Sequence, residues 1–407
     1  MNKTIKILSI SILILILFSS FSASYKILTI DNLVNVVAIA LDTSESTNLK
    51  LSFQFTNASS FSEAGSEANS PSTIYTIEAS SISSGLNLMN SAIGKELNLS
   101  HCKLIAISQD LAMRGISDEI YTLINEPEIR PSTNLVITKS TAKYYIENSK
   151  PLFENLLTKY YTVFSNSSQN TGYTSNTTIG EFFNRLISDD GDASTILGGL
   201  NSEPSQVNTS INSQKDSNRK SNESFVSGDL NSENFGQAVF KGDKLVGELN
   251  SIENLSYLAT TNQINGFLIS VPDPIENDNY LDVYLTPTSN AIIDIKIVNG
   301  SPYIRIKYHF TGKVSSMQEN SDYLKPSILS KISDSCDKYL QSIFSSYLYR
   351  TAKEFNSDIH GFGRFAKKLF LTSKDYRDYN WTQRYKDSFF DISVNASVRS
   401  GFLLTET

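Results

Sequence analysis

The residues of this chain best suited to chemistry lie in the segment 358–364, which reads DIHGFGR. A carboxylate close to an imidazole can perform acid–base catalysis. A glycine-rich turn can hold a phosphate if it follows a strand and opens a helix. Here the segment follows a long helical pattern, and His360 has no evident partner in the neighbouring sequence. We therefore interpret Asp358, Gly361 and Gly363 as architectural: the glycines end the helix in the left-handed conformation, and the carboxylate accepts nearby backbone N–H groups.

The sequence predicts no metal ion, cofactor or catalytic residue. None of its three histidines stands at ligand spacing from a second His, Cys or carboxylate. His101 and Cys102 are adjacent, so on a strand their side chains would point to opposite faces. The acidic run 189–192 (DDGD) lacks the oxygen ligands of an EF-hand loop, and we interpret it as a solvated loop. The serine-hydrolase elbow and the P-loop motif are absent.

An aromatic cluster lies close to the C-terminal end, at Trp381, Tyr385, Phe389 and Phe390. Its spacing of about four residues is compatible with carbohydrate stacking or with core packing. Core packing is the interpretation that we favour.

The composition is that of a globular protein that can build hydrophobic cores. The chain has 407 residues, of which 40% are hydrophobic and only 19% charged, and its net charge is -7. This charge argues against nucleic acid as the main partner, because that contact needs clustered Lys and Arg. Cys102 and Cys336 are interpreted as buried apolar residues, with a single disulfide as the alternative.

The N-terminal residues 1–24 carry an export signal. Lys3 and Lys6 precede an apolar run of about 12 residues, which is shorter than the roughly 20 that a membrane span needs. Cleavage after Ser24 and retention as an anchor are both compatible with this pattern. Either outcome places the body of the protein outside the cytoplasmic membrane.

Strand and helix patterns alternate along the chain, which indicates a mixed α/β (α+β) fold of three consecutive domains, each a β-sheet with packed helices. Residues 33–41 read as a buried strand and residues 49–55 as a half-buried one. A hairpin turns at the Lys-Gly-Asp-Lys of residues 241–244, and a long amphipathic helix spans about residues 325–355. The expected division is as follows: 1–24, signal or anchor; 25–200, N-terminal α/β domain; 201–234, disordered Ser/Asn-rich linker; 235–285, small middle domain; 286–407, C-terminal domain with the long helix.

Four motifs in order resemble the Ger(x)C family of spore germination proteins. They read LSHCKLIAISQDLAMRGI (99–116), EPEIRPSTNLVITKSTAKYYI (126–146), AVFKGDKLVGELN (238–250) and NSDIHGFGRFAKKLF (356–370), the last followed by Trp381 and the final DISVNASVRSGFL. The resemblance covers nearly the whole chain after the signal. It assigns a structural role to His101, Gly115, Glu128, Arg130, Phe240, Gly242, Gly247, Asp358, Gly361, Gly363 and Trp381.

This resemblance implies a non-enzymatic C subunit of a nutrient germinant receptor, without cofactor. The implied partners are two membrane-embedded subunits, A and B, at the spore inner membrane, and the implied signal is a nutrient such as an amino acid. Family members usually carry a lipobox cysteine, but residues 19–26 (SSFSASYK) contain none. We therefore hypothesise that the apolar N-terminus stays as an uncleaved anchor on the extracytoplasmic side.

Two other functions remain open from the residues alone. A deep cleft between domains would favour an extracytoplasmic solute-binding protein. A convergent cluster of titratable residues in a pocket would favour a secreted enzyme acting on cell wall or lipid. The resemblance favours the receptor subunit over both.

Overall fold

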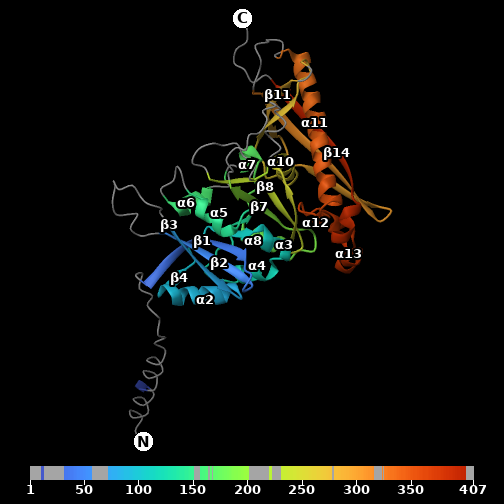
Figure 1. Ribbon diagram of the computed structural model, residues 1–407. Coiled ribbons are helices and arrows are strands. Elements are labelled where there is room, and N and C mark those ends of the chain that lie inside the picture. Colours follow the sequence, from blue (N-terminus) through green and yellow to red (C-terminus); the bar gives the residue numbers. More distant parts are fainter. Residues whose placement is uncertain are drawn as a thin grey trace, which may run out of the picture.

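The computed structural model describes residues 11–12, 32–56, 72–150, 156–163, 166, 168–200, 220–221, 231–276, 279–315, 323 and 325–399. The expected anchor at 1–24 and most of the expected linker at 201–234 lie outside these residues. Within them, strands and helices mix as predicted, in two sheets (Figure 1).

The first sheet has the strand order β3-β2-β1-β5-β6-β7-β8-β9, and β4 also pairs with β1. β1, β5, β6 and β7 are parallel to one another, whereas β2, β3, β8 and β9 are antiparallel additions at the two sides. The bounds of its strands are β1 Leu33–Thr43, β2 Leu49–Thr56, β3 Ser72–Ala79, β4 Glu96–Asn98, β5 Leu104–Ser108, β6 Asn134–Thr138, β7 Ser194–Leu200, β8 Ser232–Lys241 and β9 Lys244–Leu249.

Helices cover both faces of this sheet, which explains its continuous apolar strands. Along β1, Ile39 and Leu41 point into the core on one face, and Ala38 and Ala40 into the core on the other. The helices are α2 Ile82–Ile93, α3 Gln109–Arg114, α4 Ser117–Ile124, α5 Ala142–Asn148, α6 Leu157–Val163, α7 Ser168–Thr171 and α8 Ile179–Leu186.

The prediction that residues 49–55 form a half-buried strand is wrong in its burial. The polar face of β2 is buried as well, because α5 and α6 cover it. There Gln54 accepts a hydrogen bond of 2.8 Å from the hydroxyl of Tyr161, and Ser52 shares one of 2.8 Å with Thr76. These internal partners allow polar side chains to be buried.

The second sheet has the order β10-β11-β13-β12, and β14 pairs in parallel with β13. The long helix α11 (Pro326–Lys353) packs on it through buried residues such as Leu340, Phe344 and Tyr347, and runs along one side of the molecule (Figure 1). The remaining elements are α10 Ser251–Thr260, β10 Phe267–Pro272, β11 Tyr280–Pro287, β12 Ile292–Val298, β13 Ser301–Val314, α12 Gly363–Ala366, η4 Lys367–Leu369, α13 Ser373–Tyr379, α14 Trp381–Arg384, η5 Tyr385–Asp387 and β14 Phe389–Arg399.

The predicted hairpin at residues 241–244 forms, but the strand with which it pairs, β7, lies in another expected domain. β8 begins at Ser232, within the expected linker, and pairs with β7 of the first sheet. β10 and β11, from the same expected middle domain, belong to the second sheet. The expected boundaries at 235 and 285 therefore do not coincide with the division between the sheets.

Candidate functional site: a joint between the two sheets

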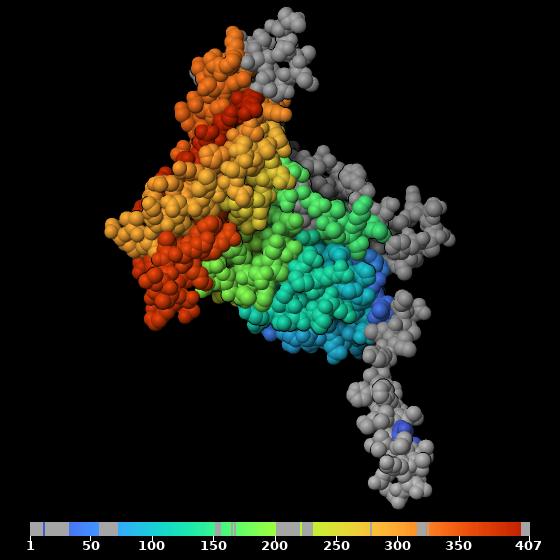
Figure 2. Space-filling view, turned by 180° about the vertical axis from the view of Figure 1, so that it is seen from behind, coloured from blue at the N-terminus to red at the C-terminus, as the bar shows by residue number. Residues whose placement is uncertain are grey.

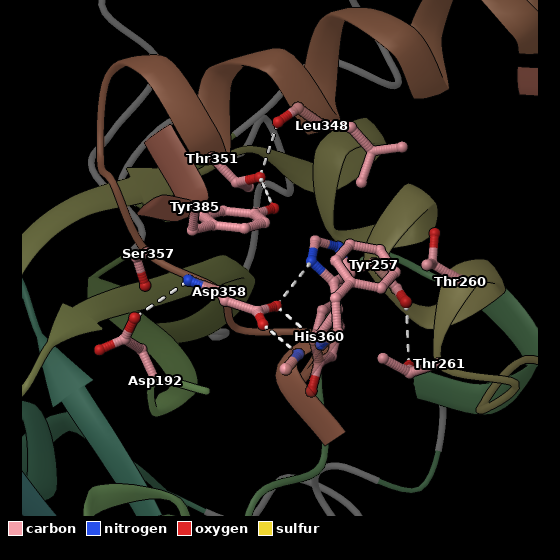
Figure 3. Close-up of polar contacts among 12 residues, drawn as sticks. Asp192, Tyr257, Thr260, Thr261, Leu348, Thr351, Ser357, Asp358, His360 and Tyr385 are labelled. Carbon is pink, nitrogen blue, oxygen red and sulfur yellow. Dashed lines mark hydrogen bonds and ion pairs between the residues drawn. The ribbon is translucent and has the colours of Figure 1, made fainter. Parts of the chain in front are cut away.

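Two loops that the sequence analysis treated separately meet in the structure. Residues 188–192 connect α8 to β7, and residues 354–362 follow α11. The backbone N–H of Asp192 donates to the carbonyl oxygen of Asp358 at 2.9 Å, and the N–H of Asp358 donates to Asp192 Oδ2 at 3.0 Å. Figure 3 shows Asp358 between Asp192 and His360. We call residues 188–192, 241–242, 357–363 and Trp381 the inter-sheet joint.

Glycines allow the two loops to approach so closely. A Cβ atom on Gly363 would lie 2.4 Å from the carbonyl oxygen of Asp190, and one on Gly191 would lie 2.9 Å from that of Asp358. Gly361 has a φ of +71°, and a Cβ there would lie 2.2 Å from Arg185 Nη1. Side chains at these positions would force the loops apart.

Asp192 is the residue that connects the most segments in the joint. Its carboxylate accepts hydrogen bonds from Lys241 Nζ at 3.0 Å and from the Gly242 N–H at 3.1 Å, in addition to that from Asp358. Lys241 also donates to the carbonyl of Thr382 at 2.9 Å. The side chain of Asp192 is only 6% exposed, so the interpretation of residues 189–192 as a wholly solvated loop is wrong. No group of three His, Cys, Asp or Glu that could hold a metal ion occurs among the described residues.

Asp358 is fully buried and accepts three hydrogen bonds, two of them from nearby backbone N–H groups as its turn predicted. The N–H of Phe362 donates to Oδ1 at 3.0 Å, while the N–H of Gly363 and Trp381 Nε1 donate to Oδ2 at 2.9 and 2.8 Å. Burial raises the pKa of the Asp358 carboxyl to about 6, and these hydrogen bonds limit the rise. The carboxylate thus orders its own loop and fixes Trp381.

The predicted helix stop at Gly361 and Gly363 is wrong in position. α11 already ends at Lys353, and Asn356, with a φ of 48°, is the first left-handed residue after it. Gly361 instead forms the turn before the short helix α12, which begins at Gly363. The long helix ends earlier because the loop after it must return to the first sheet, where Ser357 Oγ donates to the carbonyl of Phe240 at 2.6 Å.

His360 has a partner that the neighbouring sequence did not reveal. Its Nε2 shares a hydrogen bond of 2.6 Å with the hydroxyl of Tyr347 in α11, and its ring stacks on Phe362. Burial, together with the positive charge of Arg185, lowers the pKa of His360 to about 3. The imidazole is therefore neutral near pH 7, and its Nδ1, 4.0 Å from Asp358 Oδ1, does not form a true ion pair.

The aromatic cluster of the C-terminal end is core, as we favoured. Trp381 and Tyr385 are buried, and Tyr385 shares a hydrogen bond of 2.9 Å with Thr351 of α11. Phe390 packs edge-on against Tyr349. Only Phe389 is exposed, and one exposed ring does not form the platform that carbohydrate stacking would need.

The motif residues of the middle segment also contact the joint or its neighbours. Gly242 forms the β8–β9 turn with a φ of +59°, and Phe240 packs edge-on against Phe182 of α8. A Cβ on Gly247 would lie 2.2 Å from the Phe355 ring, so β9 also lies directly against the segment after α11. Gly115 lies against Asp243 at the same hairpin turn, where a Cβ would be 2.6 Å from Oδ2.

Three motif residues lie away from the joint. His101 lies exposed in a turn before β5, not on a strand as expected. Glu128 accepts a hydrogen bond of 2.6 Å from the N–H of Leu99, and the carbonyl of Arg130 accepts one of 2.9 Å from Thr133. Their structural role as family residues stays a prediction.

The joint offers fixed hydrogen bonds rather than a reactive group. Both cysteines are buried and free, as favoured over the disulfide, and burial raises the pKa of Cys102 and of Cys336 to about 12.

The sequence analysis missed Arg185, Lys241, Tyr347 and Ser357, which come from four different elements or loops. Lys241 and Ser357 lay in motifs that had been singled out, whereas Arg185 and Tyr347 did not.

Comparison with known proteins places this architecture in a family. A model of the spore germination protein N-terminal domain matches residues 27–200, and one described as spore germination B3/GerAC-like, C-terminal, matches residues 235–401. Since the two matches cover most of the 407 residues, the chain belongs to the Ger(x)C family of spore germination proteins. No curated protein matches the sequence.

A solved structure described as the crystal structure of the GerBC protein is similar to the chain. The similarity has a TM-score of 0.48 at 16% sequence identity and covers 88% of this chain and 96% of that one.

The joint lies between the two regions that the family models match. The C-terminal region supplies β8 and β9 to the sheet of the N-terminal region, and the joint fastens the two regions a second time.

Proposed function

We propose that this chain is a non-enzymatic C subunit of a nutrient germinant receptor and is needed for germination in response to nutrients. The observation that carries this proposal is the match of both family regions, in order, along residues 27–200 and 235–401. The joint supports it, because the buried Asp192 and Asp358 are held by internal donors and their arrangement serves to fasten two regions together. A fastened body of this kind suits a protein that acts by contact with partners.

The proposed partners are the membrane-embedded A and B subunits, met at the extracytoplasmic face of the spore inner membrane. No helix of the described part of the chain is both long and apolar enough to cross a membrane. From the apolar run that follows Lys3 and Lys6, we propose that residues 1–24 attach the chain as an uncleaved anchor. Sequencing of the mature N-terminus tests the anchor, and a chain that begins at Tyr25 would refute it.

Purification of a C-terminally tagged chain from spore membranes tests the partnership. We expect two polytopic membrane proteins to co-purify in constant ratio, and to be lost when detergent is replaced by a denaturant. An unrelated tagged membrane protein of similar abundance serves as the control. Recovery of the chain alone, or equally with the control's partners, would contradict the proposal.

A further inference from the structure

The group of short helices that follows the joint carries a local excess of positive charge. Residues 364–386, which span most of α12 and all of η4, α13 and α14, contain seven lysines and arginines and only two aspartates, although the net charge of the whole chain is -7. Figure 2 shows this orange-red part of the chain as a lobe at the lower left margin, and Figure 1 places α13 at the same end of the molecule. We call residues 364–386 the basic lobe.

Most cations of the basic lobe have no carboxylate partner. Lys367 forms an ion pair of 3.0 Å with Asp189. Lys374 forms one of 2.5 Å with Asp378. Five others form none with a carboxylate of the described residues: Arg364, Lys368, Arg377, Arg384 and Lys386. Positive charge without a local counter-ion attracts an anionic surface.

Two leucines project from the lobe among these cations. Leu369 is 50% exposed and Leu371 is 101% exposed, more than any other large hydrophobic side chain of the described residues. Phe370 between them has an extended backbone, with a φ of -103° and a ψ of 140°. Its ring packs against those of Tyr376 and Tyr379, at 5.6 and 5.1 Å between centres. Because successive side chains of an extended segment point to opposite sides, the two leucines point outward.

The turn that carries the leucines is held in place on both sides. Thr372 and Asp375 form a capping box at the start of α13, in which each N–H donates to the side chain of the other residue at 3.1 Å. The hydroxyl of Tyr376 donates to the carbonyl of Asp189 at 3.2 Å, which fixes α13 to the joint. The exposure of the leucines is therefore a property of the folded chain.

An anionic lipid surface fits both the charge and the leucines. Apolar side chains can enter the boundary between headgroups and acyl chains, while lysines and arginines beside them attract anionic headgroups. An acidic protein would complement the charge, but a stable protein interface buries about 800 Å² on each partner around a packed apolar core. Two leucines on a projecting turn supply little of such a core.

We propose that the basic lobe contacts an anionic phospholipid surface, with Leu369 and Leu371 inserted and with Lys368 and Arg377 at the headgroup phosphates. This contact is distinct from the anchor proposed for residues 1–24, which tethers the chain without orienting it. Since the lobe is bound to the joint through Asp189, the contact sets the orientation of both regions on the lipid surface.

A fluorescent label on the full-length chain tests this contact. Leu371→Cys carries the label in the lobe, and Leu268→Cys is the matched control, an exposed leucine of β10, whose partner β11 lies at the opposite end of Figure 1. The buried Cys102 and Cys336 should stay unlabelled. The vesicles carry nitroxide-labelled acyl chains, which quench the label, in phosphatidylcholine alone or mixed with an equal part of phosphatidylglycerol.

We expect quenching of the label in the lobe by the vesicles that contain phosphatidylglycerol, and loss of this quenching at high salt. Lys368→Glu with Arg377→Glu, in the Leu371→Cys chain, should reduce the quenching to that of the Leu268→Cys control. Lys331→Glu with Lys338→Glu makes the same charge change on exposed residues of α11 and should leave the quenching unchanged. The N-terminal residues are identical in every variant, so any lipid contact of their own affects all labels alike.

Equal quenching of the two labels would overturn the inference, and so would equal effects of the two pairs of charge reversals or of the two kinds of vesicle. Absence of quenching in both kinds of vesicle would also overturn it and would assign the leucines to a protein partner. These outcomes are independent of the proposed receptor role, because the measurement needs no partner subunit and no spore.

Discussion

Asp192 and Asp358 exchange two hydrogen bonds across 166 positions of sequence: the N–H of each residue donates to an oxygen of the other. Asp192 lies in the loop that leads into β7, and Asp358 lies in the loop that follows α11. The exchange therefore connects the first sheet directly to the packing helix of the second. This connection fixes the two regions to each other in addition to the pairing of β7 with β8.

Asp192→Asn should destabilise the chain by about 3 kcal/mol, because it breaks a buried ion pair with Lys241. Asp189→Asn is the matched control: Asp189 lies in the same acidic run, but its ion pair with Lys367 is half exposed. That substitution should cost less than about 1 kcal/mol. Urea unfolding of both variants measures the difference, and similar losses would refute a special role for Asp192.

Gly361→Ala should cost more stability than Gly94→Ala. Both glycines are left-handed, with φ of +71° and +65°, so alanine costs about 1–2 kcal/mol at either place. Only at Gly361 does the new Cβ collide with Arg185, whereas nothing lies within 4 Å of it at Gly94. Thermal unfolding should show a clearly larger loss for Gly361→Ala, and equal losses would mean that the loops have room to spare.

The stability of the joint should depend on pH through His360. Its pKa falls from 6.5 in the unfolded chain to about 3 in the folded one, so the unfolded state binds more protons between these values. The stabilisation is complete above pH 6.5 and is lost as the pH falls toward 3. Asp358 opposes this: its pKa rises from 3.8 to about 6, and its contribution is lost as the pH rises through that window.

His360→Phe separates the two effects. Between pH 7 and pH 5 the wild type should lose about 2 kcal/mol more free energy of unfolding than the variant does. The variant should also be about 1 kcal/mol less stable at pH 7, because the hydrogen bond to Tyr347 is gone. Urea titrations at the two pH values measure both quantities. Parallel pH profiles would show that His360 does not titrate as its burial requires.

Both cysteines should be unreactive in the folded chain. Cys102 and Cys336 are buried, and a thiol with a pKa of about 12 forms almost no thiolate near pH 7. A thiol reagent should label neither residue in native buffer and both in denaturant, without prior reduction. Labelling in denaturant only after reduction would indicate a disulfide.

Local patterns in the sequence were enough to predict the class of the fold and many of its elements. The apolar run at 33–41, the Gly-Asp turn at 241–244 and the three- and four-residue spacing of α11 each depend on neighbouring residues alone. The sheet to which β8 and β9 belong depends on pairing with β7, some 40 residues earlier in the chain, and no local pattern encodes that choice.

The joint could not be predicted from local sequence patterns for the same reason. The run 189–192 is rich in charge, and isolated charges favour solvent. Asp192 is buried because Lys241, Gly242 and Asp358 bring donors to it from distant segments. His360 likewise pairs with Tyr347, which lies 13 positions earlier in the sequence, in α11. The glycine pattern had placed the end of this helix too late.

Germination of spores that lack this chain tests the receptor role most directly. Purified spores of the deletion strain and the complemented strain are exposed to nutrients and, separately, to a non-nutrient trigger. The proposed function predicts that deletion abolishes or strongly slows the nutrient response, leaves the non-nutrient response unchanged, and is reversed by the intact gene. A nutrient response equal to that of the parent strain, in a background without other nutrient receptors, would contradict it.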